Sequence, residues 1–336
     1  MAADFTSPDL QQAIQSPSSS YFAAYQTQAA PVARVHSSSI SSQTFHQRYR
    51  NPGIPVVVSG LLDDEPVWSL DYLCQMLGDR VFPVRHYGRD RYQQDKRQWT
   101  SSGSGVEARS MAFPDYAQLL KTGVAQEQDL YLARCSIKET PLADRCALQQ
   151  AESWFNLRFP ATSLNLWLGA GGHTSCLHYD PMDGLLMQLN GAKKVLLFPP
   201  HQTYNLYPIP VYKQLRYGLK LRSVYSQVYP QRPDLQTFPR FAGAMPHASE
   251  VILQQGEILF LPAGWWHEVT SLGDGVVCSI NRFWNVLPPA RALLSWNKWR
   301  AHLGSIFAAP HVVAELLSAA CKPNANDEIR KLTQRL

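Results

Sequence analysis

Cysteine is scarce in this sequence, and none of it is arranged in a metal-binding or disulfide motif. Only six cysteines occur in 336 residues, all far apart, and no CxxC pair is present. The first residues also lack a basic region followed by an apolar segment, so we expect no secretory signal peptide. Scattered thiols without such a signal are typical of a reducing compartment, and we expect a cytoplasmic protein.

Long apolar runs and a strong charge of either sign are missing too. No stretch approaches the roughly 18 apolar residues that span a bilayer, so we expect no membrane partner. Charged residues make up 17% of the chain and the net charge is +5. This small excess is compatible with an anionic substrate or cofactor but does not by itself indicate nucleic acid. With 45% hydrophobic residues, the chain is long enough to bury a sizeable core.

The patterns that are present divide the chain into three parts. Residues 1–30 are rich in Ser, Ala and Gln with little apolar periodicity, which predicts a flexible N-terminal tail. Residues 31–288 contain many short alternating or β-branched runs, which predict a mainly β domain with flanking helices. The predicted strands are 55–58, 81–87, 130–133, 164–169, the segment around His178, 184–189, 193–198, 251–253, 258–261, 268–271 and 276–281; the predicted helices are 41–50, 68–77 and 113–120.

Three connecting segments carry their own predictions. Asn190-Gly191 is a strong hairpin signal and predicts direct pairing of the strands on either side. The polar residues 88–105 predict an exposed, charged loop or hairpin. The long, tyrosine-rich connection 201–249 is the kind of segment that carries substrate contacts, although surface packing explains its single tyrosines equally well.

Residues 289–336 predict a C-terminal helical region. Apolar residues recur at steps of three and four from Leu293 to Ile306 and again from Val313 to Ala320, which predicts a pair of amphipathic helices. Such a pair either covers the β core or contacts another subunit. We predict a homodimer formed through these helices.

The most informative stretch is His178-Tyr179-Asp180. Side chains alternate along a strand, so His178 and Asp180 face the same way while Tyr179 faces the other. A histidine and a carboxylate so placed are two thirds of a 2-His-1-carboxylate triad, which holds Fe(II) and leaves other positions open. The run GEILFLPAGWWH ends at His267 and supplies a candidate third ligand. We expect Trp265 and Trp266 to limit solvent access to this metal.

These motifs resemble those of the JmjC-type cupin hydroxylases, particularly relatives of the asparaginyl hydroxylase that inhibits the hypoxia-inducible factor. The resemblance covers roughly residues 31–284, and HYDPMDGLLMQLNGAKKVLLFPP and GEILFLPAGWWHEVTSL are its most specific parts. It implies a double-stranded β-helix, the jelly roll of cupins, with the metal in its mouth. The asparaginyl hydroxylase has Asn where this chain has Gly184, so the resemblance does not carry that substrate over.

By position, the resemblance implies that His178, Asp180 and His267 bind Fe(II). It also implies that Lys193 holds the distal carboxylate of 2-oxoglutarate, with Lys194 exposed to solvent. Three further residues that it assigns to the cofactor pocket are Tyr131, Ser175 and Asn281. Simple alternation puts the neighbours of Ser175 on the face of His178, so either the strand has a bulge or Ser175 is wrongly assigned.

The leading functional hypothesis is therefore an Fe(II)- and 2-oxoglutarate-dependent dioxygenase. It would use O2 to hydroxylate a C–H bond of a protein side chain, a modified tRNA base or a small metabolite, releasing succinate and CO2. Because the cofactor carries this chemistry, no acid–base dyad is expected. The alternatives are a histone N-methyl-lysine demethylase, although no zinc-finger or chromatin-reader pattern accompanies the core, a non-catalytic metal-binding cupin, or a cupin that uses another metal for non-oxidative work.

Overall fold

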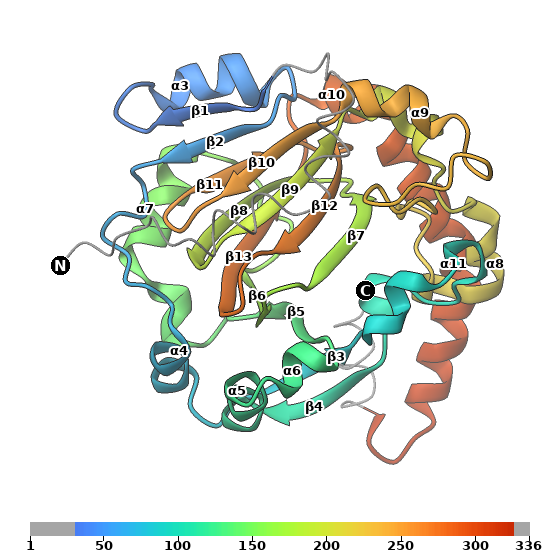
Figure 1. Cartoon of the computed structure of the whole chain (residues 1–336), viewed down its shortest axis with the longest axis horizontal. Coiled ribbons are helices and arrows are strands. Elements are labelled where there is room, and N and C mark those ends of the chain that lie inside the picture. Colours follow the sequence, from blue (N-terminus) through green and yellow to red (C-terminus); the bar gives the residue numbers. More distant parts are fainter. Residues whose placement is uncertain (1–30, 326–336) are drawn as a thin grey trace.

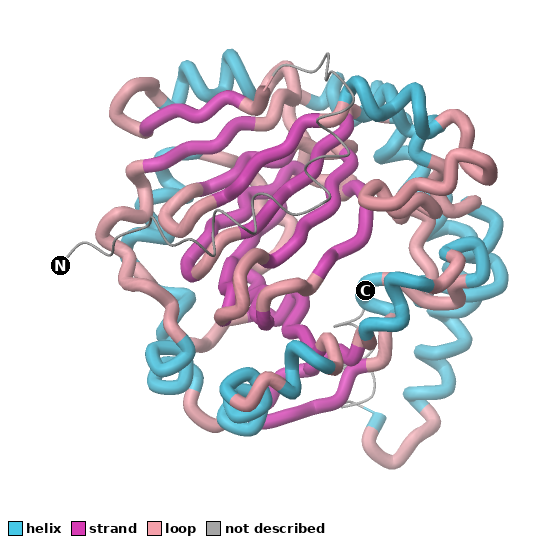
Figure 2. Tube along the Cα trace, in the orientation of Figure 1, coloured by secondary structure: helices cyan, strands magenta, loops and turns pink. Residues whose placement is uncertain are grey.

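Two β-sheets form the centre of the protein, and helices surround them (Figures 1 and 2). The computed structural model describes residues 31–325, except for the side chain of Ser104. The predicted tail at residues 1–30 lies outside this part. The observed architecture confirms the prediction of a mainly β, cupin-like fold with a C-terminal helix.

Within the described residues, the larger sheet has nine strands and the smaller sheet has four. The larger sheet runs in the order β1 (Ala33–His36), β2 (Val56–Ser59), β11 (Ile258–Leu261), β8 (Asp183–Asn190), β13 (Val276–Trp284), β6 (Asn165–Ala170), β5 (Leu130–Ser136), β3 (Val81–His86) and β4 (Ala108–Ala112). The smaller sheet runs in the order β10 (Ser249–Leu253), β9 (Lys193–Phe198), β12 (Trp266–Ser271) and β7 (Thr174–Tyr179).

From β6 onward the chain alternates between the two sheets, as in a double-stranded β-helix, except that the consecutive strands β9 and β10 both belong to the smaller sheet. Strands β6, β8, β11 and β13 belong to the larger sheet, and β7, β9, β10 and β12 belong to the smaller one. Buried aliphatic side chains fill part of the space between the sheets, with Leu259 from one side meeting Val195 and Leu253 from the other. Each such burial stabilises the fold by roughly 1.5–3 kcal/mol.

Helices cover the outer face of the larger sheet. The longer elements outside the sheets are α3 (Ser42–Phe45), η1 (His46–Arg50), α4 (Leu70–Leu77), α5 (Phe113–Lys121), α6 (Val124–Glu127), α7 (Cys146–Phe155), η6 (Pro200–Leu206), α8 (Gln214–Tyr217), α9 (Phe241–Ala244), α10 (Pro289–Leu294) and α11 (Trp296–Ala320). Phe45 of α3 packs against both Phe155 of α7 and Phe260 of β11 in the main core. Ser41 and Ser69 cap α3 and α4 by accepting a backbone N–H hydrogen bond.

The predicted hairpin at Asn190-Gly191 is wrong. Strand β8 pairs with β11 and β13, while β9 pairs with β10 and β12, so the turn joins two different sheets. The Gln188 side chain donates hydrogen bonds to the carbonyls of Asn190 and Gly191, and the Asn190 amide donates to Val276. A turn does form at Asn190-Gly191, where Gly191 has a positive φ of 68°. Closure of the β-helix, however, decides which strands pair.

The predicted pair of C-terminal helices is also wrong, because α11 is one helix that continues through Pro310. By length and composition alone, α11 could cross a membrane, contrary to our expectation from the sequence. Its inner face nevertheless belongs to the domain, where it packs on α8. There Asn297 donates to the Gly264 carbonyl, and the buried Arg300 donates to the Ile209 carbonyl.

Residues 88–105 are not the exposed loop that was predicted. They form the short 3-10 helices η2 (Arg89–Gln93), η3 (Lys96–Gln98) and η4 (Gly103–Gly105). Lys96 is buried, where its ammonium group donates to the Val228 carbonyl and lies 3.9 Å from the centre of the Tyr229 ring. A run of charged residues lies on a solvated face only if no distant segment of the chain supplies aromatic rings or carbonyl groups that bind the charged side chains.

A buried ion pair ties α10 to the jelly roll. Arg291 donates two hydrogen bonds to the fully buried Asp183, which also accepts from the Ala263 backbone N–H. We expect Arg291→Ala to lower the free energy of unfolding by about 3–5 kcal/mol, because it leaves a buried carboxylate without its cation. Urea unfolding measures this loss. The exposed Arg109, paired with Glu107, is the matched control, and Arg109→Ala should cost no more than about 1 kcal/mol. Equal losses in the two variants would contradict the expectation.

Candidate metal centre

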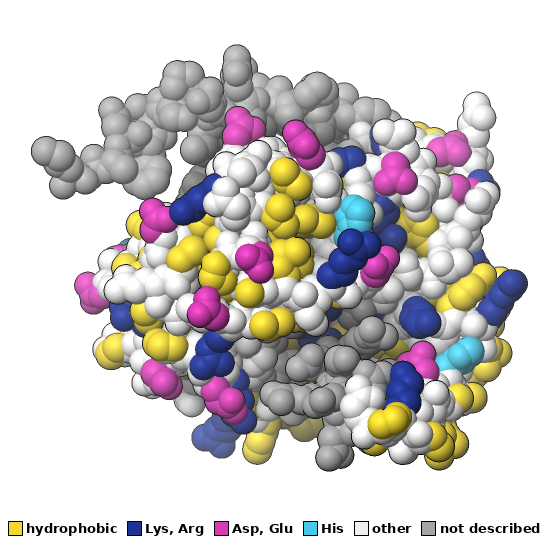
Figure 3. Space-filling view, turned by 90° about the horizontal axis from the view of Figure 1, so that it is seen from below, with side chains coloured by type: hydrophobic (Ala, Val, Ile, Leu, Met, Phe, Trp, Pro, Cys, Tyr) yellow, Lys and Arg dark blue, Asp and Glu magenta, His cyan; other side chains and the backbone are white. Residues whose placement is uncertain are grey.

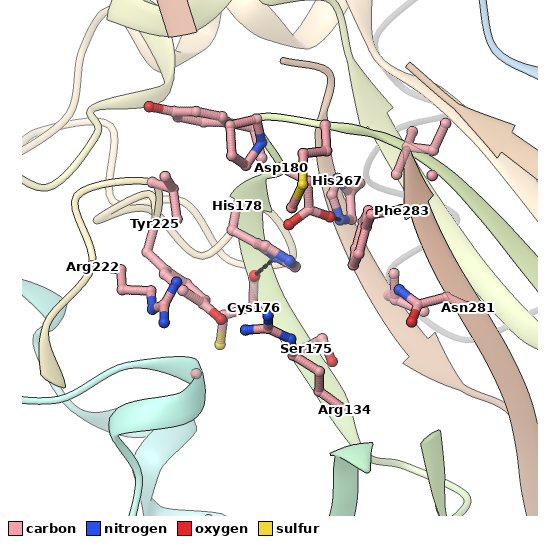
Figure 4. Close-up of a pocket in the computed structure, with 18 of the residues that line it drawn as sticks. Arg134, Ser175, Cys176, His178, Asp180, Arg222, Tyr225, His267, Asn281 and Phe283 are labelled. Carbon is pink, nitrogen blue, oxygen red and sulfur yellow. Dashed lines mark hydrogen bonds and ion pairs between the residues drawn. The ribbon is translucent and has the colours of Figure 1, made fainter. Parts of the chain in front are cut away.

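His178, Asp180 and His267 meet at one end of the jelly roll, although 89 positions separate the two histidines in the sequence (Figure 4). Strands β7 and β12 pair in antiparallel register with His267 directly opposite His178. Asp180 follows the last residue of β7. One potential ligand atom from each residue lies within 4.8 Å of the other two, and Asp180 Oδ2 is 3.5 Å from His267 Nε2.

Both imidazoles are oriented by backbone carbonyls in a way that suits metal binding. Nδ1 of His178 donates to the Cys176 carbonyl at 2.8 Å, and Nδ1 of His267 donates to the Trp265 carbonyl at 3.0 Å. The proton is thereby fixed on Nδ1, which leaves the Nε2 lone pair of each ring available as a ligand. Two neutral imidazoles and one carboxylate are the donor set of the Fe(II) facial triad, so these residues fit that metal.

The electrostatics favour the same protonation state. Burial, and to a smaller extent the neighbouring His178, lower the pKa of His267 to about 4 against the opposing effect of Asp180. At neutral pH, His267 is therefore an uncharged ligand rather than an imidazolium. The His178 ring stacks on Tyr225 with ring centres 4.9 Å apart, which holds its orientation from the other side.

A bulge in β7 decides where Ser175 points. His178 pairs with His267 and Ser175 pairs with Val269, so three steps along β7 match two steps along β12. The extra residue changes the alternation of side chains, and Ser175 lines the same cavity as His178. The sequence left two explanations open, a bulge in this strand or a wrong assignment of Ser175, and the structure contains the bulge.

The candidate triad lies in a cavity of about 470 Å³ that also contains Lys193. The Lys193 ammonium group is buried and donates to the hydroxyls of Tyr131 and Ser279. Burial lowers its pKa to about 8, so the side chain is a buried, desolvated cation at neutral pH. Such a group suits a carboxylate of 2-oxoglutarate. Lys194, expected to be exposed, is buried as well.

The other predicted pocket residues also line this cavity. Asn281 of β13 accepts a hydrogen bond from the Trp167 indole at 2.9 Å. Tyr131 of β5 stacks on His173 with ring centres 3.7 Å apart, and His173 in turn contacts the buried Asp129. The Tyr131 hydroxyl, which is 3.3 Å from Lys193 Nζ, is therefore held by a stacked and hydrogen-bonded support.

The expected role of the two tryptophans is wrong. Neither Trp265 nor Trp266 is among the residues that line the cavity. Trp266 is fully buried against Tyr179, where its indole donates to Thr203. Trp265 donates to the Gly53 carbonyl. Both rings anchor the strand that holds His267, so they position a ligand instead of shielding the metal.

Several cavity residues were missed by the sequence analysis. Arg85, Arg134, Arg222, Tyr87 and Tyr225 line the cavity but come from elements distant in the sequence. None lies in a recognisable motif. A charged residue inside an otherwise apolar strand is the one available signal, and Arg134 in the run LYLARCS provides it.

Comparisons with known proteins agree with this geometry. A family described as a cupin-like domain matches residues 41–288. Lysine-specific demethylase 8 of Danio rerio is 28% identical over 72% of this chain and 55% of its own length. Lysine-specific demethylase JMJ31 of Arabidopsis thaliana is 28% identical over 58% of this chain and 34% of its own length. The human HSPB1-associated protein 1 is 39% identical over 41% of this chain and 27% of its own length.

The chain thus spans between about a quarter and about a half of the length of these relatives. A JmjC domain-containing protein of Dictyostelium discoideum also matches, with 28% identity over 70% of this chain. The family match covers most of the chain and includes both sheets of the jelly roll. Together with the His-Asp-His group, it shows that the chain belongs to the cupin-like, JmjC-type family, whose cofactors are Fe(II) and 2-oxoglutarate.

Proposed function

We propose that this protein is an Fe(II)- and 2-oxoglutarate-dependent oxygenase that hydroxylates a C–H bond of its substrate. One observation carries the proposal. The three candidate metal ligands and the buried Lys193 line a single cavity, and hydrogen bonds orient both histidines and the lysine. A cupin that only binds metal has no need of a buried cation beside the metal site.

Different residues of the chain would bind the metal and the co-substrate. His178, Asp180 and His267 would hold Fe(II), and Lys193 would hold the distal carboxylate of 2-oxoglutarate. Tyr131 and Ser175 offer hydroxyls to the same carboxylate, and burial of the cavity strengthens each of these contacts. When bound, Fe(II) and 2-oxoglutarate supply the oxidising power with O2, and they account for the release of succinate and CO2.

A second candidate, N-methyl-lysine demethylation, is supported by two of the relatives, which are named lysine-specific demethylases. The two outcomes share the same first event. Hydroxylation of an N-methyl carbon gives an unstable product that releases formaldehyde, while hydroxylation of another carbon gives a stable alcohol. The relatives favour the demethylase outcome. Hydroxylation that gives a stable alcohol would instead act on a protein side chain, a modified tRNA base or a small metabolite.

We also propose a homodimer through α11. The outer face of this helix exposes apolar side chains at steps of three, four and seven residues, namely Trp299, Leu303, Ile306, Val313 and Leu317. Ile306 and Leu317 are each more than 60% exposed. Such a continuous apolar stripe is unusual on a monomer, and a second copy of the same helix would bury it.

The first prediction concerns the metal ligands. Asp180→Ala and His267→Ala should each lower Fe(II) affinity by more than the roughly 10–100-fold typical of losing an outer-shell partner. Both should also abolish succinate formation from 2-oxoglutarate. Metal titration and a succinate assay measure the two effects. His201→Ala, which removes an exposed histidine outside the cavity, is the matched control. Undiminished turnover in Asp180→Ala would refute the oxygenase function. The protein would be a non-catalytic cupin if the wild type bound Fe(II) but formed no succinate with any substrate class.

The second prediction separates the two chemical outcomes. Incubation with N-methyl-lysine peptides should release formaldehyde if the protein is a demethylase. A stable product that gains one oxygen atom, detected by mass spectrometry without formaldehyde, would instead support hydroxylation.

The third prediction concerns Lys193. Folding removes its ammonium group from water. A pKa of about 8 instead of 10.5 means that this burial lowers the free energy of unfolding by about 3 kcal/mol at neutral pH. Lys193→Met should therefore leave the cofactor-free protein at least as stable, while lowering 2-oxoglutarate affinity at least tenfold. Because the wild-type amine loses its charge above pH 8, wild-type affinity for 2-oxoglutarate should fall between pH 7 and pH 9. Calorimetry with Mn(II) in place of Fe(II) tests both, and a pH-independent affinity would count against the assigned role.

The fourth prediction concerns the oligomer. Light scattering should report a dimer for the wild-type protein and a monomer for Ile306→Glu, because a charge in the apolar stripe cannot be buried without a partner. Val81→Glu alters another exposed apolar residue, on β3, and should leave the dimer intact. A monomeric wild-type protein would disprove the proposal.

A further inference from the structure

The cavity is strongly biased toward positive charge. Of the described residues that line it, the only acidic one is the candidate ligand Asp180. The basic residues that line it are Arg85, Arg91, Arg134, Lys193, Arg222 and Lys298. One carboxylate among six cations leaves a net positive interior even after a dianionic co-substrate is bound, so the remaining charge calls for a further anion.

Three of these cations already have a function in the fold or with the co-substrate. Lys193 faces the proposed 2-oxoglutarate site. Arg91 donates to the Ser101 carbonyl and lies 4.0 Å from the centre of the Trp99 ring. Lys298 donates to the Pro181 carbonyl. Arg85, Arg134 and Arg222, which we call the arginine cluster, are the other three basic residues of the cavity.

Arg134 is directed into the cavity by an uncommon backbone conformation. Its φ of 57° is in the left-handed region, which residues other than glycine rarely adopt. It lies in a bulge of β5, where the pairing with β6 shifts register between Leu132 and Cys135. Without this bulge, strict alternation would place Arg134 on the face of the core residue Leu132. Bulges that redirect a side chain are common beside active sites.

Arg85 is buried with one of its donors unpaired, although its side chain is hydrogen-bonded to Tyr87. It is only 7% exposed, and within residues 31–325 its Nε is a buried donor without a hydrogen-bond partner. Leaving such a charged donor unpaired destabilises the folded protein. Unsatisfied buried donors that line a cavity indicate a ligand that supplies the acceptor.

The members of the arginine cluster also repel one another. Burial lowers the pKa of Arg222, and the positive charges of Arg134 and Arg85 lower it further. Figure 4 shows Arg134 and Arg222 at the same end of the site, below His178 in the view. Asp180 interacts with both Arg134 and Arg222. The arginine cluster therefore includes two residues close to the candidate metal ligand Asp180, in the same cavity.

We propose that Arg85, Arg134 and Arg222 form a substrate subsite for an anionic group, a carboxylate or a phosphate, next to the carbon that is oxidised. This inference rests on the proposed oxygenase function and narrows its substrate class. Guanidinium groups bind both anions through paired N–H donors. A lone methyl-lysine, itself a cation, would be repelled here, so a demethylase substrate needs a neighbouring acid group.

An extended nucleic-acid surface is a poorer explanation of this charge. On the face shown in Figure 3, Lys and Arg side chains are interspersed with Asp and Glu and form no continuous basic patch. The cationic excess is instead inside the cavity. That placement fits recognition of one acid group rather than tracking of a phosphate backbone.

The test uses full-length protein saturated with Mn(II) and 2-oxoglutarate, so that binding occurs without turnover. Calorimetry then measures binding of inorganic phosphate and of a capped tri-aspartate peptide, with a capped tri-lysine peptide as the opposite charge. Arg134→Asn removes the guanidinium but tolerates the left-handed backbone, and Arg222→Gln is a second variant. Arg109→Gln, on the exposed end of a surface pair, is the matched control.

We expect at least one of the two anions to bind the wild-type protein and Arg109→Gln, more weakly at high salt, and the tri-lysine peptide not to bind. Arg134→Asn and Arg222→Gln should each weaken anion binding at least tenfold while changing 2-oxoglutarate affinity less than twofold. The preferred anion distinguishes a phosphate from a carboxylate substrate.

Three results would overturn the subsite. Wild-type protein that binds 2-oxoglutarate but neither anion refutes the subsite and leaves the proposed function intact. Anion binding that is unchanged in both variants refutes it too. A parallel loss of 2-oxoglutarate affinity would assign the arginines to the co-substrate. Failure of the wild-type protein to bind 2-oxoglutarate at all would instead refute the proposed function.

Discussion

The antiparallel pairing of β7 with β12 is the constraint on which the site depends. It sets His267 opposite His178 and places Asp180 within reach of both. The strands are held in turn by buried aromatic packing, in which Tyr179 of β7 meets Trp266 of β12. Because side chains alternate, packing on one face and ligands on the other are fixed by the same register.

Two bulges adapt this regular scaffold to its chemistry. The bulge in β7 brings Ser175 to the face of His178, and the bulge in β5 turns Arg134 toward the cavity. Each adds one residue to a strand while leaving the neighbouring pairs in place. A jelly roll can therefore present chosen side chains at its mouth without losing the core that stabilises it.

The cavity combines groups that are costly to bury. Lys193 and the arginine cluster are desolvated cations, and His267 is a histidine held neutral by burial. These groups stay in place only because the surrounding sheets hold them through many other contacts. Their arrangement pre-organises the site for anions and a metal ion. Binding of the co-substrate and of an acidic substrate group would relieve the repulsion that the empty fold tolerates.

The sequence by itself determined the fold class and the strands that hold the triad, because alternation and β-branched runs are local properties of the chain. It also indicated His178, Asp180 and His267, since their residue types and flanking apolar runs are distinctive. Only the tertiary structure decided that β8 and β9 separate into different sheets, that α11 is one helix, and that Lys96 and Lys194 are buried. It alone brought Arg85, Arg134 and Arg222 together, because their proximity depends on non-local strand pairing and a bulge that no local pattern encodes.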